Sequence, residues 1–569
     1  MNLGLSLPPS STCAMSYTEM TSIEVSPCYT VSPCFKVTAS QSRPLSSCVN
    51  RRTGIFSVPD DILLLIISYV EVKDILSLRK TSRRLYSMTK LRWVWSDALK
   101  RHIIDRGLPV PAADANLRAF SAGDLEARAV HAAKLHENWY SAHPRYRQSI
   151  EFQADRILPD DYVDKHKSTV SQVLFLKGHN GELLVTVVDR IITCWEVPLD
   201  GSGAYRVAEW VSRTKIEQVV VNDDPKSDMV LAFATKDSIH HTTVEYKALT
   251  LDVFHGCFTV SASLRTVQEG DFPVHASMHA MHGDYVILGD PTVVWYCSQP
   301  NEVKSMGVYP SDHAMRPNQI LAIKLINRYM IVVRERSFRL IYAPSWKNIR
   351  TTYNATCISS SVHMDVVATS SVVVARTPTA NGEDELEWPS TPVTILSRYS
   401  DGGFDTLRQY DLLPLSRPKA RSSGYEYAGD RDEPDGLPCM LPSQSTRVIR
   451  VPPSCNNLHV GSSGKGIWML TRNVTSRRSV YPARCILGFD MASDLHGRRE
   501  TSEDEVNYWC DSKGGNDLHV CRDVLYSRRC DMSEILSKKY SIVSASLDDT
   551  VGRIAIGDRF GKVEVLDLV

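Results

Sequence analysis

Apolar residues recur at helical spacing from about residue 56. In the segment SVPDDILLLIISYV, Ser57 can cap a helix, and Pro59, Asp60 and Asp61 suit its first turn. The apolar residues at 62–70 leave this short helix almost no polar face, so it must be buried on more than one side. A three-helix unit of this size cannot cover such a helix alone, and the pattern therefore predicts a partner surface.

Helical patterns continue to residue 140. Two short helices are expected at 73–78 and 82–88, and a further helix ends near Gly107 and Pro109. The stretch 121–140 is rich in strong helix formers. Its apolar stripe consists of Leu125, Ala129, Ala132, Leu135 and Trp139. We expect this helix to bridge the first unit to the second.

From about residue 170 the chain changes to short Val- and Ile-rich runs separated by turn residues. The runs come in pairs, such as LLVTVVDRIITCWEV and RIAIGDRFGKVEVLDL, and no long helix separates them. This pattern predicts an all-β architecture: a sandwich array, a barrel or a propeller. We identify about seven paired units, each somewhat longer than the roughly 40–50 residues of a propeller blade. Polar insertions at 401–455 and 492–533, predicted to be loops or disorder, account for the excess.

These patterns predict a multidomain chain of 569 residues with four parts. The parts are a disordered Ser/Thr/Pro-rich tail at 1–52, a small all-α three-helix domain at 53–100, a helical linker at 101–165, and a large all-β domain at 166–569, expected to be a roughly seven-bladed β-propeller.

Charge and composition argue against several functions. Lys plus Arg equals Asp plus Glu at 65 each, so no global field attracts nucleic acid or anionic lipid. No apolar run reaches the roughly 18 residues of a membrane helix, and the first residues lack the basic region of a secretory signal. We expect a protein of the cytoplasm or nucleus. Its 14 cysteines form no C-x-x-C pair and are expected to be reduced. No catalytic motif, metal site or cofactor fingerprint was found, so we expect no enzyme activity, metal or cofactor.

The residues at 58–88 resemble the F-box. The resemblance rests on four short motifs in order: Val58-Pro59-Asp60-Asp61-Ile62-Leu63, Ile66-Ile67-Ser68-Tyr69-Val70, Asp74-Ile75-Leu76 and Ser82-Arg83-Arg84-Leu85. Thr81 and Leu85 depart from the family, which usually has Val and an aromatic residue there. The Ala-rich helix that follows resembles F-box proteins of fungal type that carry a divergent β-domain.

The resemblance implies an adaptor. F-boxes bind the Skp-type linker of SCF (Skp–cullin–F-box) ubiquitin ligases, and the linker joins them to a cullin. Eight residues are expected to be a mixture of linker contacts and internal core: Val58, Pro59, Ile62, Leu63, Ile66, Ile67, Ile75 and Leu76. The substrate would be an unknown protein bound by the β-domain at unknown residues.

A second resemblance, to WD-repeat propellers, rests on Gly178-His179, Asp189 and Trp195-Glu196. It favours a propeller for the β-domain over another all-β fold. Two alternatives to a ligase adaptor stay open: a scaffold that uses its F-box outside any ligase, and an enzyme with an active site in the propeller channel. In the enzyme, the helical unit would be a cap that buries its apolar surface against the β-domain.

Overall fold

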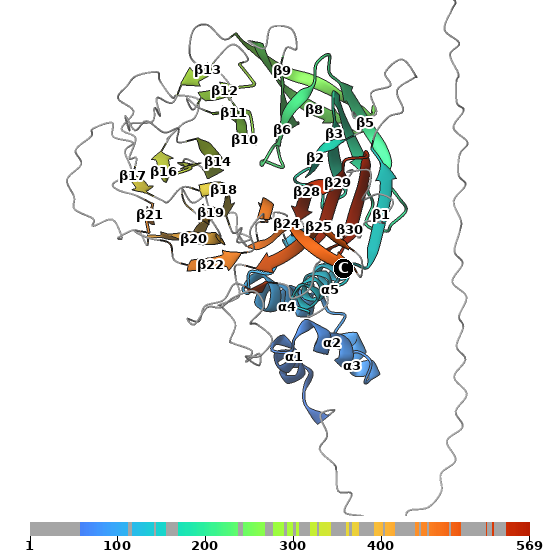
Figure 1. Cartoon of the computed structure of the whole chain (residues 1–569). Coiled ribbons are helices and arrows are strands. Elements are labelled where there is room, and N and C mark those ends of the chain that lie inside the picture. The colour runs from blue at the N-terminus through green and yellow to red at the C-terminus, as the bar shows by residue number, and fades with distance from the viewer. Residues whose placement is uncertain are drawn as a thin grey trace, which may run out of the picture. The chain divides into compact units, whose positions relative to one another are not determined.

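The computed structural model describes residues 57–569 with gaps, of which the longest are 155–168, 306–318, 343–359, 375–387, 416–437, 491–518 and 528–541. The tail predicted at 1–52 lies outside the described residues. Figure 1 shows the helices and strands in chain order.

The described helices precede the strands. They are α1 (Asp60–Ser68), α2 (Val72–Leu78), α3 (Arg83–Met88), α4 (Arg92–Ala98), a π-helical continuation (Leu99–Ile104), a 3₁₀ turn (Leu117–Ala119) and α5 (Ala122–Trp139). Ser82 caps α3 by accepting a hydrogen bond from the Leu85 amide. After the π-helical turns, Gly107 adopts a φ of +66°, a conformation that favours glycine and ends the helix. The predicted three-helix unit at 53–100 therefore contains four helices, because the chain turns at Leu91 and starts α4 separately.

The described strands form seven antiparallel sheets, and none of them closes on itself. The first four sheets in chain order are β2–β5 (Val170–Phe175, Leu183–Val188, Ile191–Glu196, Tyr205–Val211), β6–β9 (Ile216–Val221, Met229–Lys236, Thr243–Asp252, Cys257–Val267), β10–β13 (Met278–His282, Tyr285–Leu288, Val293–Tyr296, Val303–Ser305) and β14–β17 (Ile320–Ile326, Tyr329–Arg334, Ser337–Tyr342, Ser360–His363).

The other three sheets complete the β-region. They are β18–β22 (Val367–Val374, Val393–Asp401, Phe404–Pro414, Cys439–Met440, Arg447–Val451), β23–β27 (Cys455–Val460, Lys465–Ser476, Ser479–Asp490, His519–Val520, Tyr526–Ser527), and a sheet that joins β1 (Gln148–Gln153) to β28–β30 (Ile542–Asp548, Arg553–Asp558, Lys562–Asp567). The small helical region and the large all-β region that the sequence predicts are both present.

Each sheet contacts the next one along the chain, and the last sheet contacts the first. These contacts join β2 to β6, β6 to β10, β10 to β14, β14 to β18, β18 to β23, β23 to β28, and β28 back to β2. The apolar core lies between the sheets; Val185 and Val187 of β3, for example, pack with Leu231 and Phe233 of β7. The alternating Val- and Ile-rich strands supply these buried faces.

Two predictions about the linker and the insertions need correction. The segment 101–165 is not wholly helical, because β1 lies within it and pairs antiparallel with β30, from Gln148 opposite Asp567 to Gln153 opposite Lys562. β1 is polar and partly exposed, so it lacks the apolar run by which the other strands are identified. The segment 401–455 is not a simple loop either: β20, β21 and β22 lie within it, and only 416–437 forms a long gap in the described residues.

Candidate partner-binding site

Helix α1 carries two apolar faces. Its start follows from sequence, since Asp60 and Asp61 lie at the end of the helix that favours negative charge. Leu63 and Ile67, four residues apart, point inward and are each 2% exposed. Helix α4 contacts α1, and helices α2 to α4 contribute further buried side chains: Val72, Ile75, Leu85, Met88, Val94 and Trp95.

The outer face of α1 remains open to solvent. Its four side chains follow the spacing i, i+3, i+4 and i+7, which places them in one row along a helix. They are Ile62, Leu65, Ile66 and Tyr69, with exposed fractions of 44%, 52%, 45% and 70%. We call this row the outer α1 stripe. Large apolar side chains gathered on one helix face typically mark a binding surface.

The eight residues predicted from sequence divide between the two environments. Leu63, Ile67 and Ile75 are buried and belong to the internal core. Pro59, Ile62 and Ile66 are exposed, while Val58 and Leu76 are half-buried. The prediction did not include Leu65 and Tyr69. The same helical spacing, counted from Ile62, would have found both.

Charged side chains lie at each end of α1. At its start, Arg84 of α3 pairs with Asp60, with 2.8 Å between Nε and Oδ1. At its end, the Arg101 guanidinium lies 5.1 Å from the centroid of the Tyr69 ring, and Arg101 Nε donates to Asp97 Oδ1 at 2.9 Å. These contacts place the beginning of α3 and the end of the α4 segment beside α1.

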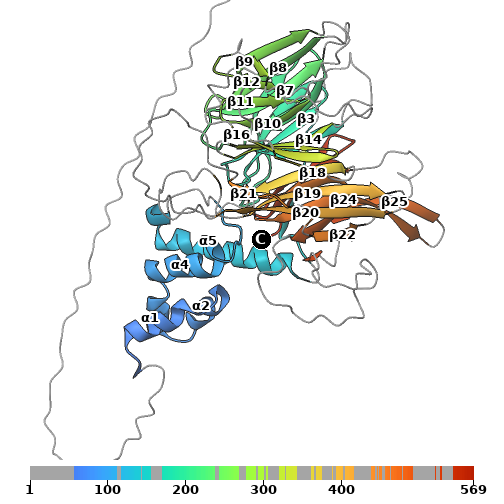
Figure 2. The ribbon, with the colours of Figure 1, turned by 90° about the vertical axis from the view of Figure 1, so that its left-hand side faces the viewer.

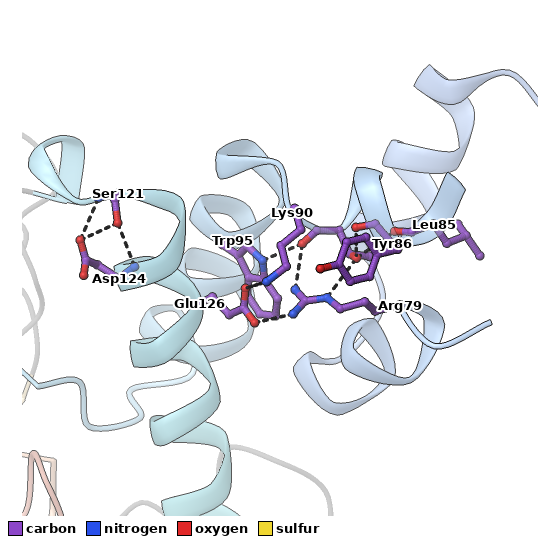
Figure 3. A network of polar contacts seen from close by, with 9 residues as sticks. Arg79, Leu85, Tyr86, Lys90, Trp95, Ser121, Asp124 and Glu126 are labelled. Atoms are coloured by element: carbon purple, nitrogen blue, oxygen red, sulfur yellow. Dashed lines mark hydrogen bonds and ion pairs between the residues drawn. The ribbon is translucent and has the colours of Figure 1, made fainter. Parts of the chain in front are cut away.

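A polar network holds helices α2 to α4 to α5 (Figure 3). Arg79, at the end of α2, donates to Glu126 Oε1 of α5 at 2.6 Å and to the Thr89 carbonyl oxygen at 3.1 Å. Trp95 Nε1 donates to the same carbonyl at 2.8 Å, and Arg79 lies 5.5 Å from the centroid of the Trp95 ring. The hydrogen bond from Arg79 lowers the pKa of Glu126 below its usual value, so the carboxylate stays charged at neutral pH.

Helix α5 begins at a reciprocal cap, which Figure 3 also shows. Ser121 Oγ accepts a hydrogen bond from the Asp124 amide at 3.1 Å, and the Asp124 carboxylate accepts one from the Ser121 amide at 3.1 Å. This capping box satisfies two amide groups at the helix start. It fixes the first turn of α5, two residues before Glu126.

The other end of α5 packs on the β-region (Figure 2). Leu135 and Trp139 join a buried cluster with strand residues Ile467, Met469, Ile486, Ile542, Ala545, Leu547, Ile554, Ile556, Leu566 and Leu568. His131 Nε2 lies 3.0 Å from the Val551 carbonyl oxygen, and Asn138 donates to the Leu568 carbonyl oxygen at 2.7 Å. The predicted bridging helix is therefore confirmed, with all five stripe residues at 1% exposure or less.

The described β-region shows charged groups that tie sheets together. Lys324 of β14 pairs with Asp223, which follows β6, at 2.5 Å. The buried Asp549 carboxylate, after β28, accepts a hydrogen bond from the Ser463 amide at 2.6 Å.

Burial raises the pKa of the Cys194, Cys297 and Cys439 thiols to about 12, so they stay protonated and unreactive.

The described residues show neither a metal site nor a membrane-spanning helix. They contain no group of three or more His, Cys, Asp and Glu side chains placed to hold a metal ion. Among these same residues, no helix is long and apolar enough to cross a membrane.

Comparison with known families identifies the class of domain that carries the outer α1 stripe. Residues 55–97 match the model of the F-box domain, so the chain contains an F-box that precedes α5 and the β-region. F-box domains bind Skp-type linkers within SCF complexes, and proteins that carry them are typically non-catalytic adaptors. None of the curated proteins matches the chain.

Proposed function

We propose that this protein is the substrate-recognition adaptor of an SCF-type ubiquitin ligase. The F-box binds a Skp-type linker, which joins it to a cullin, and the β-domain binds a target protein. The adaptor itself is not an enzyme: it raises the local concentration of the target beside the ubiquitin-transfer machinery, for ubiquitin-dependent degradation. It acts in the cytoplasm or nucleus.

The observation that carries the proposal is the solvent exposure of the outer α1 stripe. An enzyme whose helical unit is only a cap would bury Ile62 and Ile66 against the β-region. In the structure these side chains are 44% and 45% exposed, while the other end of the helical segment, at Trp139, makes the contact with the β-region. This exposure supports a role for the outer α1 stripe in binding another protein.

The path from the F-box to the β-region supports an adaptor with fixed geometry. The Arg79–Glu126 contact holds the F-box to the start of α5, and Leu135 and Trp139 hold the end of α5 to the strands. A rigid connection would present the bound target at a constant distance from the linker. This is the property that proximity catalysis needs.

We also propose that the seven sheets are blades of a divergent WD-repeat-like propeller, as in the fungal-type proteins that the sequence resembles. The contacts that run from β2 through β28 and back to β2 support this arrangement. Pairing of β1 with β30 would fasten the two ends of the β-domain together. In the blade with the WD-like motif, Trp195 Nε1 donates to Thr186 Oγ1 at 2.9 Å.

The test uses the full chain and a purified Skp-type linker. Wild type is compared with Ile66→Asp, which places a charge in the outer α1 stripe, and with Val253→Asp, which makes the same kind of change at a residue of the β-region that is 54% exposed. We expect micromolar or tighter binding by wild type and Val253→Asp, and none by Ile66→Asp, with unchanged circular dichroism. Absence of binding by folded wild-type protein would overturn the adaptor function.

A second measurement separates the ligase from the scaffold. Cullin is added to the chain with and without the linker, and the complexes are resolved by size-exclusion chromatography. A ligase adaptor should bring cullin into the complex only when the linker is present. A complex of chain and linker that excludes cullin would favour the scaffold.

A further inference from the structure

The hairpin of β24 and β25 is the longest among the described strands. Each strand has 12 residues, and the pairing runs without a break from Lys465 opposite Asp490 to Ser476 opposite Ser479. Figure 2 shows this hairpin extending past the other strands of the β-region. Its outer part therefore projects beyond the sheet to which its base belongs.

The outer part of this hairpin pairs with no third strand among the described residues. Strand β23 pairs with β24 only as far as Leu470, and β26 and β27 pair with β25 only from Cys485 onward. We call the remaining residues, 471–476 and 479–484, the outer ribbon. In the β19–β20 hairpin, by contrast, β18 and β22 pair along both sides. The outer ribbon thus has two edges whose backbone groups have no strand partner in the described part of the chain.

The sequence of this segment carries charge of only one sign. Residues 471–484 contain four arginines and no aspartate or glutamate. The β8–β9 hairpin, at 243–267, has two basic and two acidic residues, and the β19–β20 hairpin, at 393–414, has two basic and three acidic residues. The chain as a whole is neutral, so the positive charge of this hairpin is a local feature.

Two of the arginines have defined places in the outer ribbon. Arg472 lies on β24 opposite Ala483, and Arg484 lies on β25 opposite Thr471. Residues opposite one another share a face of the ribbon, and successive residues alternate between its faces. Arg472 and Arg484 therefore lie on opposite faces, near the base of the outer ribbon. The other two arginines, at 477 and 478, lie outside the described residues.

Pro482 distinguishes the two edges of the outer ribbon. A proline lacks the amide hydrogen that a strand ladder requires, and in sheets it is found mainly at edges and bulges. It lies on β25, opposite Asn473, whereas residues 471–476 contain no proline. The β24 edge is therefore the better template for a further strand. A two-stranded ribbon is only marginally stable in water, so a third strand would also stabilise it.

The base of the same hairpin is anchored to the helix that leads to the F-box. Ile467 and Met469 of β24 and Ile486 of β25 belong to the buried cluster that contains Leu135 and Trp139 of α5. The strands that carry the outer ribbon are thus held by α5. A protein bound to the outer ribbon would be joined to the F-box through this helix.

We propose that an extended acidic segment of the target protein adds to the β24 edge of the outer ribbon as a third strand, next to Arg472. The inference rests on the proposed function and names the class of target. Main-chain hydrogen bonds would supply affinity, and the arginines would favour carboxylates over neutral or basic side chains. A nucleic acid fits less well, because its phosphates would pair with the arginines but leave the β24 edge unused.

The experiment measures the fluorescence anisotropy of a labelled peptide during titration with the full chain. The peptide has about 12 residues, enough to cover a strand of ordinary length, with a central Glu-Glu pair flanked by alternating Thr and Val. Because successive residues of a strand alternate between faces, one of two adjacent glutamates lies on the face that carries Arg472.

The protein variants are Arg472→Gln, Arg472→Glu, Arg484→Glu and the double reversal to Glu. Arg265→Glu is the matched control, because Arg265 is an exposed arginine on β9, the outer strand of another sheet. A peptide with Lys-Lys in place of Glu-Glu controls for charge. A Glu-Glu peptide methylated on its backbone amide nitrogens controls for main-chain pairing.

We expect wild type and Arg265→Glu to bind the Glu-Glu peptide with the same Kd and to leave the Lys-Lys peptide unbound. Arg472→Gln should weaken Kd roughly two- to fivefold, the range of a single exposed charge pair, and Arg472→Glu should weaken it further. Arg484→Glu should have a smaller effect, because Arg484 lies one strand away from the β24 edge. Methylation should abolish binding, since the methyl groups block main-chain hydrogen bonds.

Several results would overturn the inference. Failure of wild-type protein to bind the Glu-Glu peptide, or unchanged binding by the double reversal, would show that the outer ribbon is not the contact. Equal binding of the methylated peptide would rule out strand addition. Preference for a short DNA duplex over the peptide, with the same dependence on Arg472, would make the outer ribbon a nucleic-acid contact instead.

Linker binding separates this inference from the proposed function. The double reversal should bind the Skp-type linker as wild type does, with unchanged circular dichroism, because both arginines lie outside the F-box match at residues 55–97. If the linker is bound and the peptide is not, the adaptor function stands and the outer ribbon is not the target site. If the peptide is bound and the linker is not, the adaptor function fails and the outer ribbon remains a site for acidic segments.

Discussion

Helices α1 and α5 use their apolar residues in opposite ways. Helix α5 carries one apolar stripe, and all of it is buried between the F-box and the β-region. Helix α1 carries two apolar faces, of which Leu63 and Ile67 are buried while the outer α1 stripe is exposed. An apolar face that intramolecular packing leaves uncovered is the structural sign of a missing partner. The comparison shows that α5 joins parts of one chain, whereas the outer α1 stripe is the surface that we propose for the linker.

The largest expected effect concerns the buried end of α5. Trp139→Ala removes a side chain that is 1% exposed and packs against strands from two sheets, and it should cost about 3–5 kcal/mol of stability. Trp93→Ala, at a residue that is 50% exposed, is the matched control and should change stability by less than about 1 kcal/mol. Urea unfolding followed by circular dichroism measures both. Similar losses in the two variants would contradict the assignment of α5 as the internal joint.

The next prediction compares the two faces of α1 through one chemical change. Leu63→Ala empties a position that is 2% exposed and should lower the stability of the F-box helices by about 2–5 kcal/mol. Leu65→Ala, at 52% exposure, should lower it by less than about 1 kcal/mol and should weaken linker binding instead. Hydrogen exchange of the α1–α4 amides reports local stability, and a titration with the linker reports affinity. If Leu63→Ala and Leu65→Ala increased hydrogen exchange equally, the distinction between a buried inner face and an exposed outer face of α1 would be wrong.

Local patterns made the helical region predictable. The α5 stripe follows from residues spaced three and four apart. The same spacing placed Ile62 and Ile66 on α1 but could not tell the outer face from the inner one. That distinction depends on which elements pack against Leu63 and Ile67, and the contact of α1 with α4 could not be read from the spacing.

Contacts distant in sequence were not predictable. Strand β1 is identified by its pairing with β30, more than 400 residues away, and its own polar sequence gives little signal. The contact between Arg79 and Glu126 spans 47 residues, and an isolated Arg and Glu on separate helices carry no motif. The periodicity of apolar residues indicates which face of a helix or strand is apolar, whereas these contacts depend on how the elements pack against one another.

A smaller effect is expected where the F-box meets α5. Glu126→Gln leaves Arg79, whose side chain is 13% exposed, without its carboxylate, and should cost about 1–3 kcal/mol. Glu137→Gln changes an exposed residue of the same helix and should have almost no effect. Urea unfolding at neutral pH compares the two.

The Glu126 contact also predicts a dependence on pH. Because Arg79 lowers the pKa of Glu126 below its ordinary value of 4.5, the stabilisation is complete above that value and is lost as the pH falls through the lowered pKa. The free energy of unfolding of wild-type protein should therefore approach that of Glu126→Gln as the pH falls below about 4.5. A constant difference between the two proteins across this range would show that the carboxylate charge is not the source of the stability.

The smallest predicted effect concerns the start of α5, where the bridging helix depends on its cap. Ser121→Ala removes the oxygen that accepts from the Asp124 amide and should cost about 1 kcal/mol, while Ser121→Asn keeps an acceptor there and should cost only a few tenths. Faster hydrogen exchange should be confined to the first turn of α5, because the rest of the helix is held by its buried stripe. If hydrogen exchange becomes faster along the whole helix, the stability of all of α5 depends on its cap. The rigid link between the F-box and the β-region would then depend on this turn rather than on packing.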